Sequence, residues 1–455
     1  MKSDALITNP YGFIALNRKI VALGDICVAK DGIQTGPFGS QLHSADYVDV
    51  GTPIIMVEHL GENIIKSEST PFVSDEDIKR LVKYTMKSGD IIFSRVGYVD
   101  KRALVKDVHE GWLFSGSLLR IRPDLNLVDA TYLSYFFGFP RLKKYMGDVS
   151  VGATRPSINT SILKSIPVVL PELRVQKVIG EILANIDDKI ACNHTLSKTL
   201  EDIAQTIFKS WFIDFDPVKA KMAGEKPAGM DAATAALFPD SMEESELGLI
   251  PKGWLVGSLG DIADLQGGYA FKSSSWMENG VPVIKIGSVK PGFVDLTQVS
   301  YVDVSTAEAI PDVYRIPAGS LVVGLTGYVG QVGLVRTHDP VPLVNQRVAK
   351  FKLNSGEWKI PYIYCFTRGE KFKGIVEELA TGTAQQNVSN SQILSIPMVI
   401  PSQDIREMFD NSLKTFFHQI INLADENESL KFIRDALLPR LISGELQIPD
   451  EMLAS

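Results

Sequence analysis

The chain repeats itself at a spacing of 230 residues, and this repeat limits the architecture more than any other feature of the sequence. Residues 88–106 and 318–336 are identical in that register at six pairs of positions: Gly89/Gly319, Gly97/Gly327, Tyr98/Tyr328, Val99/Val329, Leu104/Leu334 and Val105/Val335. The segment S-I-P-x-x-x-P also recurs, at 165–171 and 395–401. Solenoid repeats are far shorter, at about 20–50 residues. The sequence therefore predicts a whole domain that is duplicated together with the segment after it.

Each copy begins with a block that mixes strands and short helices. Alternation, β-branched residues and bounding glycines predict strands in three runs: 91–99, 281–289 and 321–330. Short helices are expected around 131–146 and 361–380. Because proline removes a hydrogen-bond donor and restricts the residue before it, the S-I-P segments are expected to be extended boundaries. We interpret the two blocks as mixed α+β domains, residues 1–171 and 254–401.

A long helical pattern follows each block. Apolar residues recur at steps of three and four across 172–216 and 402–445, with acidic residues between them. Such a helix would extend about 60 Å, and its own turns cannot bury an apolar stripe. We therefore expect the two helices to pair as a coiled coil, the alternative being two separate amphipathic surface helices. Residues 217–253 are interpreted as a linker and residues 446–455 as a tail.

The composition argues against several classes of protein. The 46 basic and 54 acidic residues give a net charge of −8, which does not fit a simple basic nucleic-acid binder. The acid excess lies in the helical, linker and tail segments, so local basic patches remain open to the two domains. We expect no membrane span and no secretory signal. The three cysteines are widely spaced, which favours a soluble protein of the reducing cytoplasm.

Motifs for catalysis are weak throughout the chain. Glycines at 327, 330 and 333 suggest a phosphate-binding loop, but the segment lacks both a P-loop ending and the spacing of a dinucleotide fingerprint. We interpret it as a strand pair joined by a turn. The six histidines do not stand at metal-binding spacing, and no nucleophile elbow is present. A single-chain enzyme with unrecognised motifs and a duplicated protein-binding scaffold remain alternative interpretations.

Polar and aromatic residues gather at four matching places in the two copies, near 34–41, 94–102, 115–117 and 154–159 in the first. Such side chains contact base edges and phosphates, although ordinary polar turns contain them too. The candidate DNA-binding residues of the first copy are Gln34, Thr35, Phe38, Ser40, Gln41, Arg95, Tyr98, Lys101, Arg102, Arg155 and Asn159. Those of the second copy are Tyr269, Lys272, Ser273, Ser274, Trp276, Tyr328, Gln331, Gln346, Arg347, Gln385, Gln386 and Asn387.

Short motifs stand in a fixed order along nearly the whole chain. They are LGDI at 23–26 and 259–262, IQTGPFGSQL at 33–42, IDDKI at 186–190, FKSWFIDFDPV at 208–218, ELGLIPKGW at 246–254, LQGGYAFKS at 265–273 and LLPRLISGEL at 437–446. Each motif alone is weak. In this order, and with the repeated S-I-P boundaries, the chain resembles the specificity (S) subunits of type I restriction–modification systems.

The resemblance implies a non-catalytic DNA-binding protein without a metal site. Two target recognition domains would each read one half of a bipartite site in double-stranded DNA. The two helices would form an antiparallel coiled coil that separates the domains, and the repeat would give a pseudo-two-fold axis. Two methyltransferase (M) subunits would methylate adenine at N6, and restriction (R) subunits would add cleavage. S-adenosylmethionine, ATP and Mg are expected on these partner subunits, so this chain itself would carry no cofactor.

Overall fold

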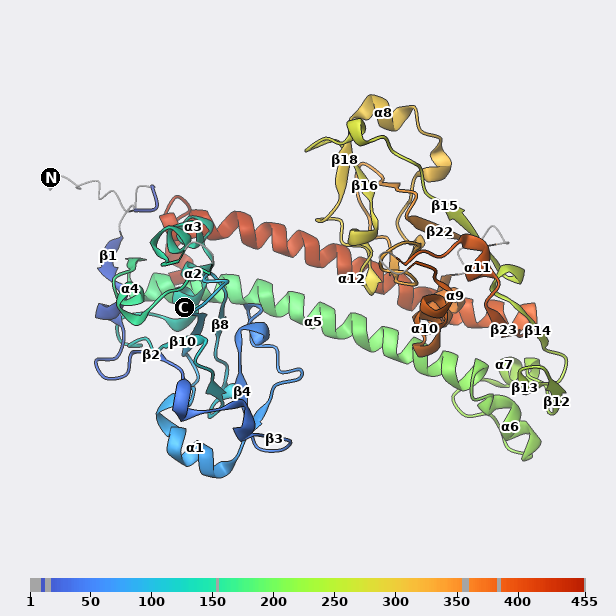
Figure 1. Cartoon of the computed structure of the whole chain (residues 1–455), viewed down its shortest axis with the longest axis horizontal. Coiled ribbons are helices and arrows are strands. Elements are labelled where there is room, and N and C mark those ends of the chain that lie inside the picture. Colours follow the sequence, from blue (N-terminus) through green and yellow to red (C-terminus); the bar gives the residue numbers. More distant parts are fainter. Residues whose placement is uncertain (1–9, 13–17, 153–154, 354–359, 383–385, 454–455) are drawn as a thin grey trace. The chain divides into compact units, whose positions relative to one another are not determined.

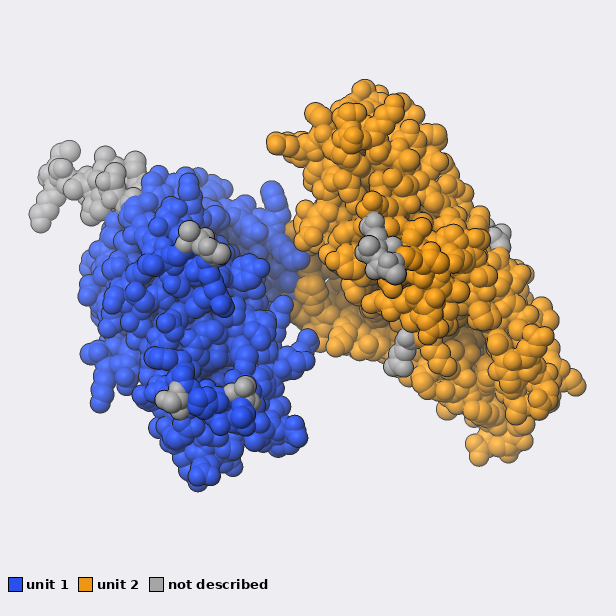
Figure 2. All heavy atoms as spheres, viewed as in Figure 1, with its two compact units in different colours: residues 1–190, 429–455 blue, residues 191–428 orange. Residues whose placement is uncertain are grey.

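The chain folds into two units, and each contains one copy of the repeat. The computed structural model describes residues 10–12, 18–152, 155–353, 360–382 and 386–453. One unit consists of Met1–Ile190 with Ser429–Ser455, and the other of Ala191–Glu428 (Figure 2). Each unit therefore includes part of each long helix as well as a globular domain.

Two mixed sheets form the domain of the first unit. The larger sheet has the order β2 (Ile33–Thr35), β10 (Leu118–Ile121), β7 (Ile91–Ser94), β8 (Arg102–Leu104) and β5 (Glu62–Asn63). The smaller has the order β3 (Tyr47–Val48), β6 (Phe72–Val73), β4 (Thr52–Ile55) and β9 (Leu113–Phe114). In β7, Ile91 and Phe93 pack in one apolar cluster and Ile92 in another. This strand is a continuous apolar run because both of its faces are covered.

The second unit repeats this topology. Its larger sheet has the order β15 (Ala263–Gly267), β22 (Val348–Leu353), β19 (Leu321–Gly324), β20 (Val332–Leu334) and β17 (Gly292–Phe293). Its smaller sheet has the order β18 (Ser300–Val302), β16 (Val281–Ile284) and β21 (Leu343–Val344). The equivalent strands follow the same order in both units, which confirms the duplicated α+β architecture.

The S-I-P segments are strands that join the two ends of each domain. In the first unit β1 (Lys19–Ala22) pairs antiparallel with β11 (Pro167–Leu170). In the second, β14 (Leu255–Ser258) pairs with β23 (Pro397–Ile400) in the same way. The predicted extended boundaries are therefore confirmed, and each one closes its domain against the strand that opened it.

The short helices also match between the copies. The helices expected around 131–146 and 361–380 are pairs: α2 (Ala130–Gly138) with α3 (Pro140–Val149), and α9 (Ile360–Arg368) with α10 (Glu370–Leu379). Two further matched pairs are α1 (Asp75–Leu81) with α8 (Val304–Glu308), and α4 (Thr160–Lys164) with α11 (Asn390–Leu394). The strands are shorter than predicted. After β7 and β19 the chain turns at glycines with positive φ, Gly97 and Gly327. The run 281–289 ends as a strand at Ile284, before the short 3-10 helix Ile286–Ser288.

The two long helices are α5 (Leu173–Phe212) and α12 (Gln403–Ser443), drawn in green and red in Figure 1. Within the second unit, Asn193 of α5 lies beside Asn427 of α12, and Phe208 lies beside Phe409, with ring centroids 5.9 Å apart. Partner numbers on α12 fall as those on α5 rise, so the helices pair antiparallel there. This pairing confirms the coiled coil and excludes two separate surface helices.

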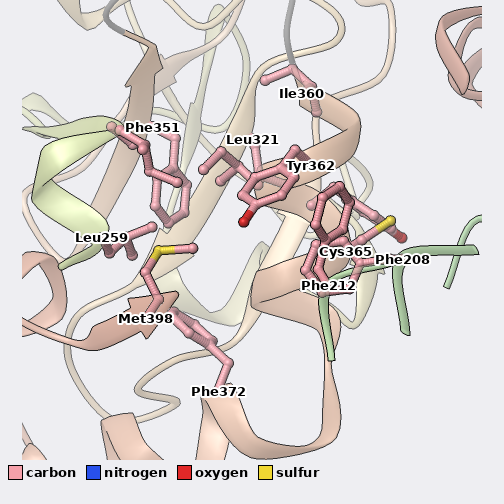
Figure 3. Close-up of a cluster of buried hydrophobic side chains, with 14 of the residues drawn as sticks. Phe208, Phe212, Leu259, Leu321, Phe351, Ile360, Tyr362, Cys365, Phe372 and Met398 are labelled. Carbon is pink, nitrogen blue, oxygen red and sulfur yellow. The ribbon is translucent and has the colours of Figure 1, made fainter. Parts of the chain in front are cut away.

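An aromatic cluster joins the helices to the domain of the second unit (Figure 3). The ring centroid of Phe212 lies 4.9 Å from that of Tyr362 in α9 and 5.1 Å from that of Phe409 in α12. The rings meet edge to face, the arrangement that aromatic quadrupoles favour. The aromatic residues at the end of α5 therefore fix the domain to the helix pair.

In the first unit, the last turns of α12 complete the core. Leu438, Leu441 and Ile442 are buried in the same cluster as Tyr132 of α2 and Ile179 of α5. The guanidinium of Arg434 in α12 also donates to the carboxylate of Asp187 in α5 at 2.7 Å. The C-terminal end of α12 is therefore part of the core of the first unit.

The segment interpreted as a linker has more structure than predicted. Residues 217–253 include most of α6 (Asp216–Met222), all of α7 (Ala232–Leu237) and the hairpin of β12 (Met242–Ser245) with β13 (Gly248–Pro251). Phe238 is 2% exposed, and its ring centroid lies 5.2 Å from that of Trp211. The elements are too short to produce a periodic apolar pattern, so the sequence resembled a linker.

The buried Asn193–Asn427 pair gives a test of the helix pairing. The Asn193 amide donates to Oδ1 of Asn427 at 3.0 Å and to the carboxylate of Glu426 at 2.8 Å. Asn193→Leu should lower the free energy of unfolding by about 1–3 kcal/mol, because it leaves the Asn427 oxygen buried without this donor. The double variant N193L/N427L should recover most of that loss, because neither position then holds an unpaired amide. Thermal unfolding of the purified chain measures both, and a double variant as unstable as the two single losses combined would contradict the pairing.

Candidate nucleic-acid interface

Backbone hydrogen bonds join three of the four predicted loop clusters of the first domain. The amide of Arg95 donates to the carbonyl of Ser117 at 3.0 Å, which links the second cluster to the third. The amide of Gly97 donates to the carbonyl of Pro156 at 2.8 Å, and that of Ile158 to the carbonyl of Arg95 at 2.9 Å. Segments up to 63 residues apart, from Arg95 to Ile158, are thus held together without using their side chains.

The second domain makes the same bonds 230 residues later. The amide of Leu325 donates to the carbonyl of Arg347, that of Gly327 to the carbonyl of Gln386, and that of Val388 to the carbonyl of Leu325, each at 2.9 Å. Because a backbone bond does not depend on the side chain, different residues occupy the same positions. The loop framework is therefore common to both copies, while its side chains differ.

The first cluster joins this framework through a close backbone approach. A Cβ atom added to Gly36 would lie 2.2 Å from the carbonyl oxygen of Ser115, and one added to Gly268 would lie 2.2 Å from that of Asn345. Only glycine fits at such a contact. All four predicted clusters therefore lie together in each domain, and we call each set the loop surface of that domain.

The glycines of the 326–333 segment each serve a structural purpose. Gly327 has φ +81°, as does Gly97 in the first copy, and the tyrosine that follows it is exposed in both. Gly330 has φ +70° and packs against Val376. Gly333 lies in β20, where an added Cβ would meet the backbone of Phe293 at 2.9 Å. These contacts explain the glycines as a turn and a close strand pairing, which favours the structural interpretation over a phosphate loop.

Most of the predicted residues are exposed at these loops. Tyr98 and Tyr328 are 67% and 61% exposed, and Phe38 is 62% exposed. The other exposed members are Arg155, Asn159, Lys272, Ser273, Ser274, Gln346, Arg347, Gln386 and Asn387. Partly exposed members are Thr35 on β2, Lys101, Tyr269 and Trp276. Ser40 lies in the turn Gly39–Gln41, and Gln385 lies outside the described residues.

Arg95 is a cation of the first loop surface and contacts an aromatic ring there. Its guanidinium lies 5.9 Å from the centroid of the Phe38 ring and donates to the carbonyl of Gly116 at 3.1 Å. Nζ of Lys101 lies 4.8 Å from the centroid of the Tyr98 ring. Aromatic faces hold both cations at the loops while leaving them free to meet an anionic partner.

Several predicted side chains are instead bound within the domain. Gln34 accepts a hydrogen bond from the buried Arg120 at 2.8 Å, and Gln41 accepts one from Tyr84 at 2.8 Å. Asn159 caps α4, and Gln331 donates to the carbonyl of Val289 at 2.6 Å. Oδ1 of Asn387 accepts a hydrogen bond from Thr326 at 2.7 Å. The polar groups of these five residues form hydrogen bonds within the domain, and residue type alone does not indicate this.

Arg102 lies inside the first domain. It is 2% exposed and donates to the carbonyl of Ser134 and, at 2.9 Å, to the carboxylate of Glu62. The predicted role in DNA contact does not fit this position, because the guanidinium faces the domain interior. We therefore leave Arg102 out of the proposed interface.

Lys285 is a residue of the second loop surface that the sequence did not indicate. Its Nζ lies 3.4 Å from the centroid of the Trp276 ring. Burial, and then the nearby Arg347 guanidinium, lower the pKa of this ammonium below its usual range. Lys285 does not belong to the matched polar clusters of the sequence, because it directly follows an apolar strand, β16, and has no basic counterpart in the first copy.

The described residues contain neither a metal-binding cluster nor a membrane-spanning helix. Among them, no group of three His, Cys, Asp or Glu side chains is placed to hold a metal ion. None of the described helices combines the length and apolar character that crossing a membrane requires.

Comparison with known proteins places this arrangement in a family. A family model described as the type I restriction modification DNA specificity domain matches residues 17–202 and 251–431, one match in each copy. The HindI type I restriction enzyme specificity subunit of Haemophilus influenzae is 27% identical over 415 residues, which are 82% of this chain and 89% of the relative. The MjaVIII specificity subunit of Methanocaldococcus jannaschii is 23% identical over 414 residues, 88% and 91% of the two chains.

A solved structure shows the same fold. The crystal structure of the type I restriction–modification system S subunit from M. genitalium superposes with a TM-score of 0.57 at 15% identity. The match covers 93% of this chain and 96% of that one. Its extent includes both domains and both long helices.

Two arginines seven positions apart provide a matched test of the interface. Arg102→Met should lower the free energy of unfolding by about 2 kcal/mol, because it removes a buried group that bonds a carboxylate and a carbonyl. Arg95→Met should leave the melting temperature nearly unchanged but weaken binding to DNA, because the Arg95 side chain belongs to the loop surface. Thermal unfolding and a DNA-binding titration of both variants make the comparison, and a stability loss for Arg95→Met equal to that of Arg102→Met would refute the distinction.

Proposed function

Because this chain belongs to the type I restriction–modification DNA specificity family, we propose that each of its two domains reads one half of a bipartite DNA target. The observation that carries the proposal is the repeated loop surface, which is built by the same backbone bonds in both domains. A framework that tolerates different side chains at fixed places suits two readers of different base sequences.

The side chains that differ between the loop surfaces have the chemistry of base and phosphate contacts. Arg95 of the first copy is replaced by Leu325 in the second, whereas Ser117 is replaced by Arg347. Arginine donates in pairs to guanine or phosphate, and aromatic side chains contact bases and sugars. The exposed Tyr98 and Tyr328 are common to both surfaces and suit a contact that does not depend on sequence.

The proposed role of the long helices is to set the distance between the half-sites. With 40 residues in α5 and 41 in α12, each helix extends about 60 Å at 1.5 Å per residue. One turn of B-DNA is about 34 Å, so helices of this length suit half-sites on successive turns. In this proposal the repeat gives a pseudo-two-fold axis, which would match the opposite polarity of the two DNA strands.

The partners in this proposal are two methyltransferase (M) subunits and, for restriction, R subunits. The M subunits would carry S-adenosylmethionine and flip the target adenine out of the duplex for N6 methylation. ATP and Mg would belong to the restriction step. Exposed apolar side chains on the helices support docking of a protein partner: Leu196 and Ile203 on α5, and Phe432 and Ile433 on α12. In this role the chain is non-catalytic and works in the cytoplasm.

Methylome mapping tests the proposal. The full chain is co-expressed with the M subunit of its own system, and N6-methyladenine is mapped across the genome. We expect one bipartite motif with a fixed spacer. Exchange of residues 1–165 for those of a relative should change one half of the motif, and exchange of residues 254–395 should change the other half only.

The controls separate this role from the other interpretations. Methylation by the chain without an M subunit would show an enzyme and contradict the proposal. A complex that methylates no bipartite motif, or a motif unaffected by either exchange, would favour a scaffold that does not read DNA.

A further inference from the structure

A basic and aromatic cluster in the second domain has its cations at positions where the first domain has neutral side chains. Beneath the Lys285 ammonium, the Trp276 ring packs against that of Phe271 with centroids 5.2 Å apart. Phe271 in turn lies beside Tyr269, with centroids 5.1 Å apart. The three aromatic rings of this loop therefore pack one against the next, and the lysine ammonium lies over the face of the last one, Trp276.

The strand register identifies what the first copy has instead of Lys285. Ile284, the last residue of β16, pairs with Val344, just as Ile55 of β4 pairs with Phe114. The residue after Ile284 is Lys285, and the residue after Ile55 is Met56. A cation of the second copy thus stands where the first has a neutral side chain.

Arg347 is the second cation of this cluster, and it too is absent from the first copy. The bridge from Leu325 to Arg347 repeats the bridge from Arg95 to Ser117, so Arg347 occupies the position of a serine. The amide of Asn345 donates to the carbonyl of Ile284 at 3.0 Å, which brings the segment that carries Arg347 beside the end of β16 and Lys285. The Arg347 charge also contributes to lowering the pKa of Lys285. In the described part of the chain, neither side chain forms an ion pair with a carboxylate.

Two neighbouring cations without an acid destabilise each other in the free protein. An anion between them would remove this repulsion and gain two charge-assisted hydrogen bonds. The cation–π contact with the Trp276 face already orders the ammonium in the free protein. Binding of an anion therefore costs less side-chain entropy. Among the anions that a DNA reader meets, the backbone phosphate is present at every nucleotide.

We propose that Lys285 and Arg347 together bind one or two adjacent backbone phosphates of the half-site read by the second domain, with Trp276 positioning the lysine. The proposal rests on the proposed function of this chain as a two-domain DNA reader. It adds a difference in position, because the first domain has its loop-surface cations, Arg95 and Lys101, at other places.

The salt dependence of binding tests the proposal. The complex of the full chain with its M subunit is titrated with a duplex that carries the mapped bipartite motif, at several salt concentrations. Each lost phosphate contact lowers the magnitude of the slope of log K against log salt by about 1. Lys285→Gln should therefore lower it by about 1 and raise Kd about threefold to tenfold near 0.1 M salt. The double variant K285Q/R347Q should lower the slope by about 2.

Two matched variants exclude a general effect of charge or folding. Lys285→Arg keeps the positive charge on the ring and should retain the wild-type slope. Lys373→Gln removes a lysine of α10 that is paired with Glu377 at 3.5 Å, and it should also leave the slope unchanged. The methylated motif should be the same for every variant, because a phosphate contact carries no base information.

Three results would overturn the phosphate contact. They are a wild-type slope in Lys285→Gln, a change of the recognised bases in the second half of the motif, or loss of M-subunit binding in place of DNA affinity. Each of these leaves the bipartite motif of the wild-type complex intact, so it counts against this inference alone. Absence of a bipartite motif in the wild-type complex would instead remove the proposed function, and this inference with it.

Discussion

Neither long helix can bury its apolar stripe alone, so α5 and α12 must pack against each other and against the domains. In the second unit, Phe212 of α5 fills the space between Phe409 of α12 and Tyr362 of the domain. In the first unit, the last turns of α12 fill the core under α2. The same burial that pairs the helices in the second unit thus also attaches each domain to the part of the helices in its own unit.

Much of the architecture could be predicted because it rests on patterns that are local or repeated. Helical periodicity predicted α5 and α12, and the 230-residue register predicted a duplicated domain, since a duplicated sequence keeps its strand order. The 217–253 segment was missed because its elements are short and its structure depends on packing at the end of α5, where Phe238 meets Trp211. The ends of β7 and β19 were not predicted because each depends on one glycine with positive φ, Gly97 or Gly327.

The candidate interface was predictable as a set of loops but not side chain by side chain. Residue type alone cannot distinguish Arg95, whose guanidinium lies over an exposed ring, from Arg102, which is 2% exposed. Both are arginines in one polar stretch, and only the tertiary environment separates them. Lys285 shows the reverse case, because an apolar strand precedes it and only the fold brings Trp276 and Arg347 beside it.

The division of the helices between the units has a consequence for the order in which the chain folds during synthesis. All of the second unit lies within Ala191–Glu428, whereas the first unit needs Ser429–Ser455 as well as Met1–Ile190. Leu438, Leu441 and Ile442, which belong to the core of the first unit, are translated only after the whole of the second unit. The first domain thus leaves the ribosome before the second but completes its core after it, and in the interval its apolar surface is exposed to aggregation and proteolysis.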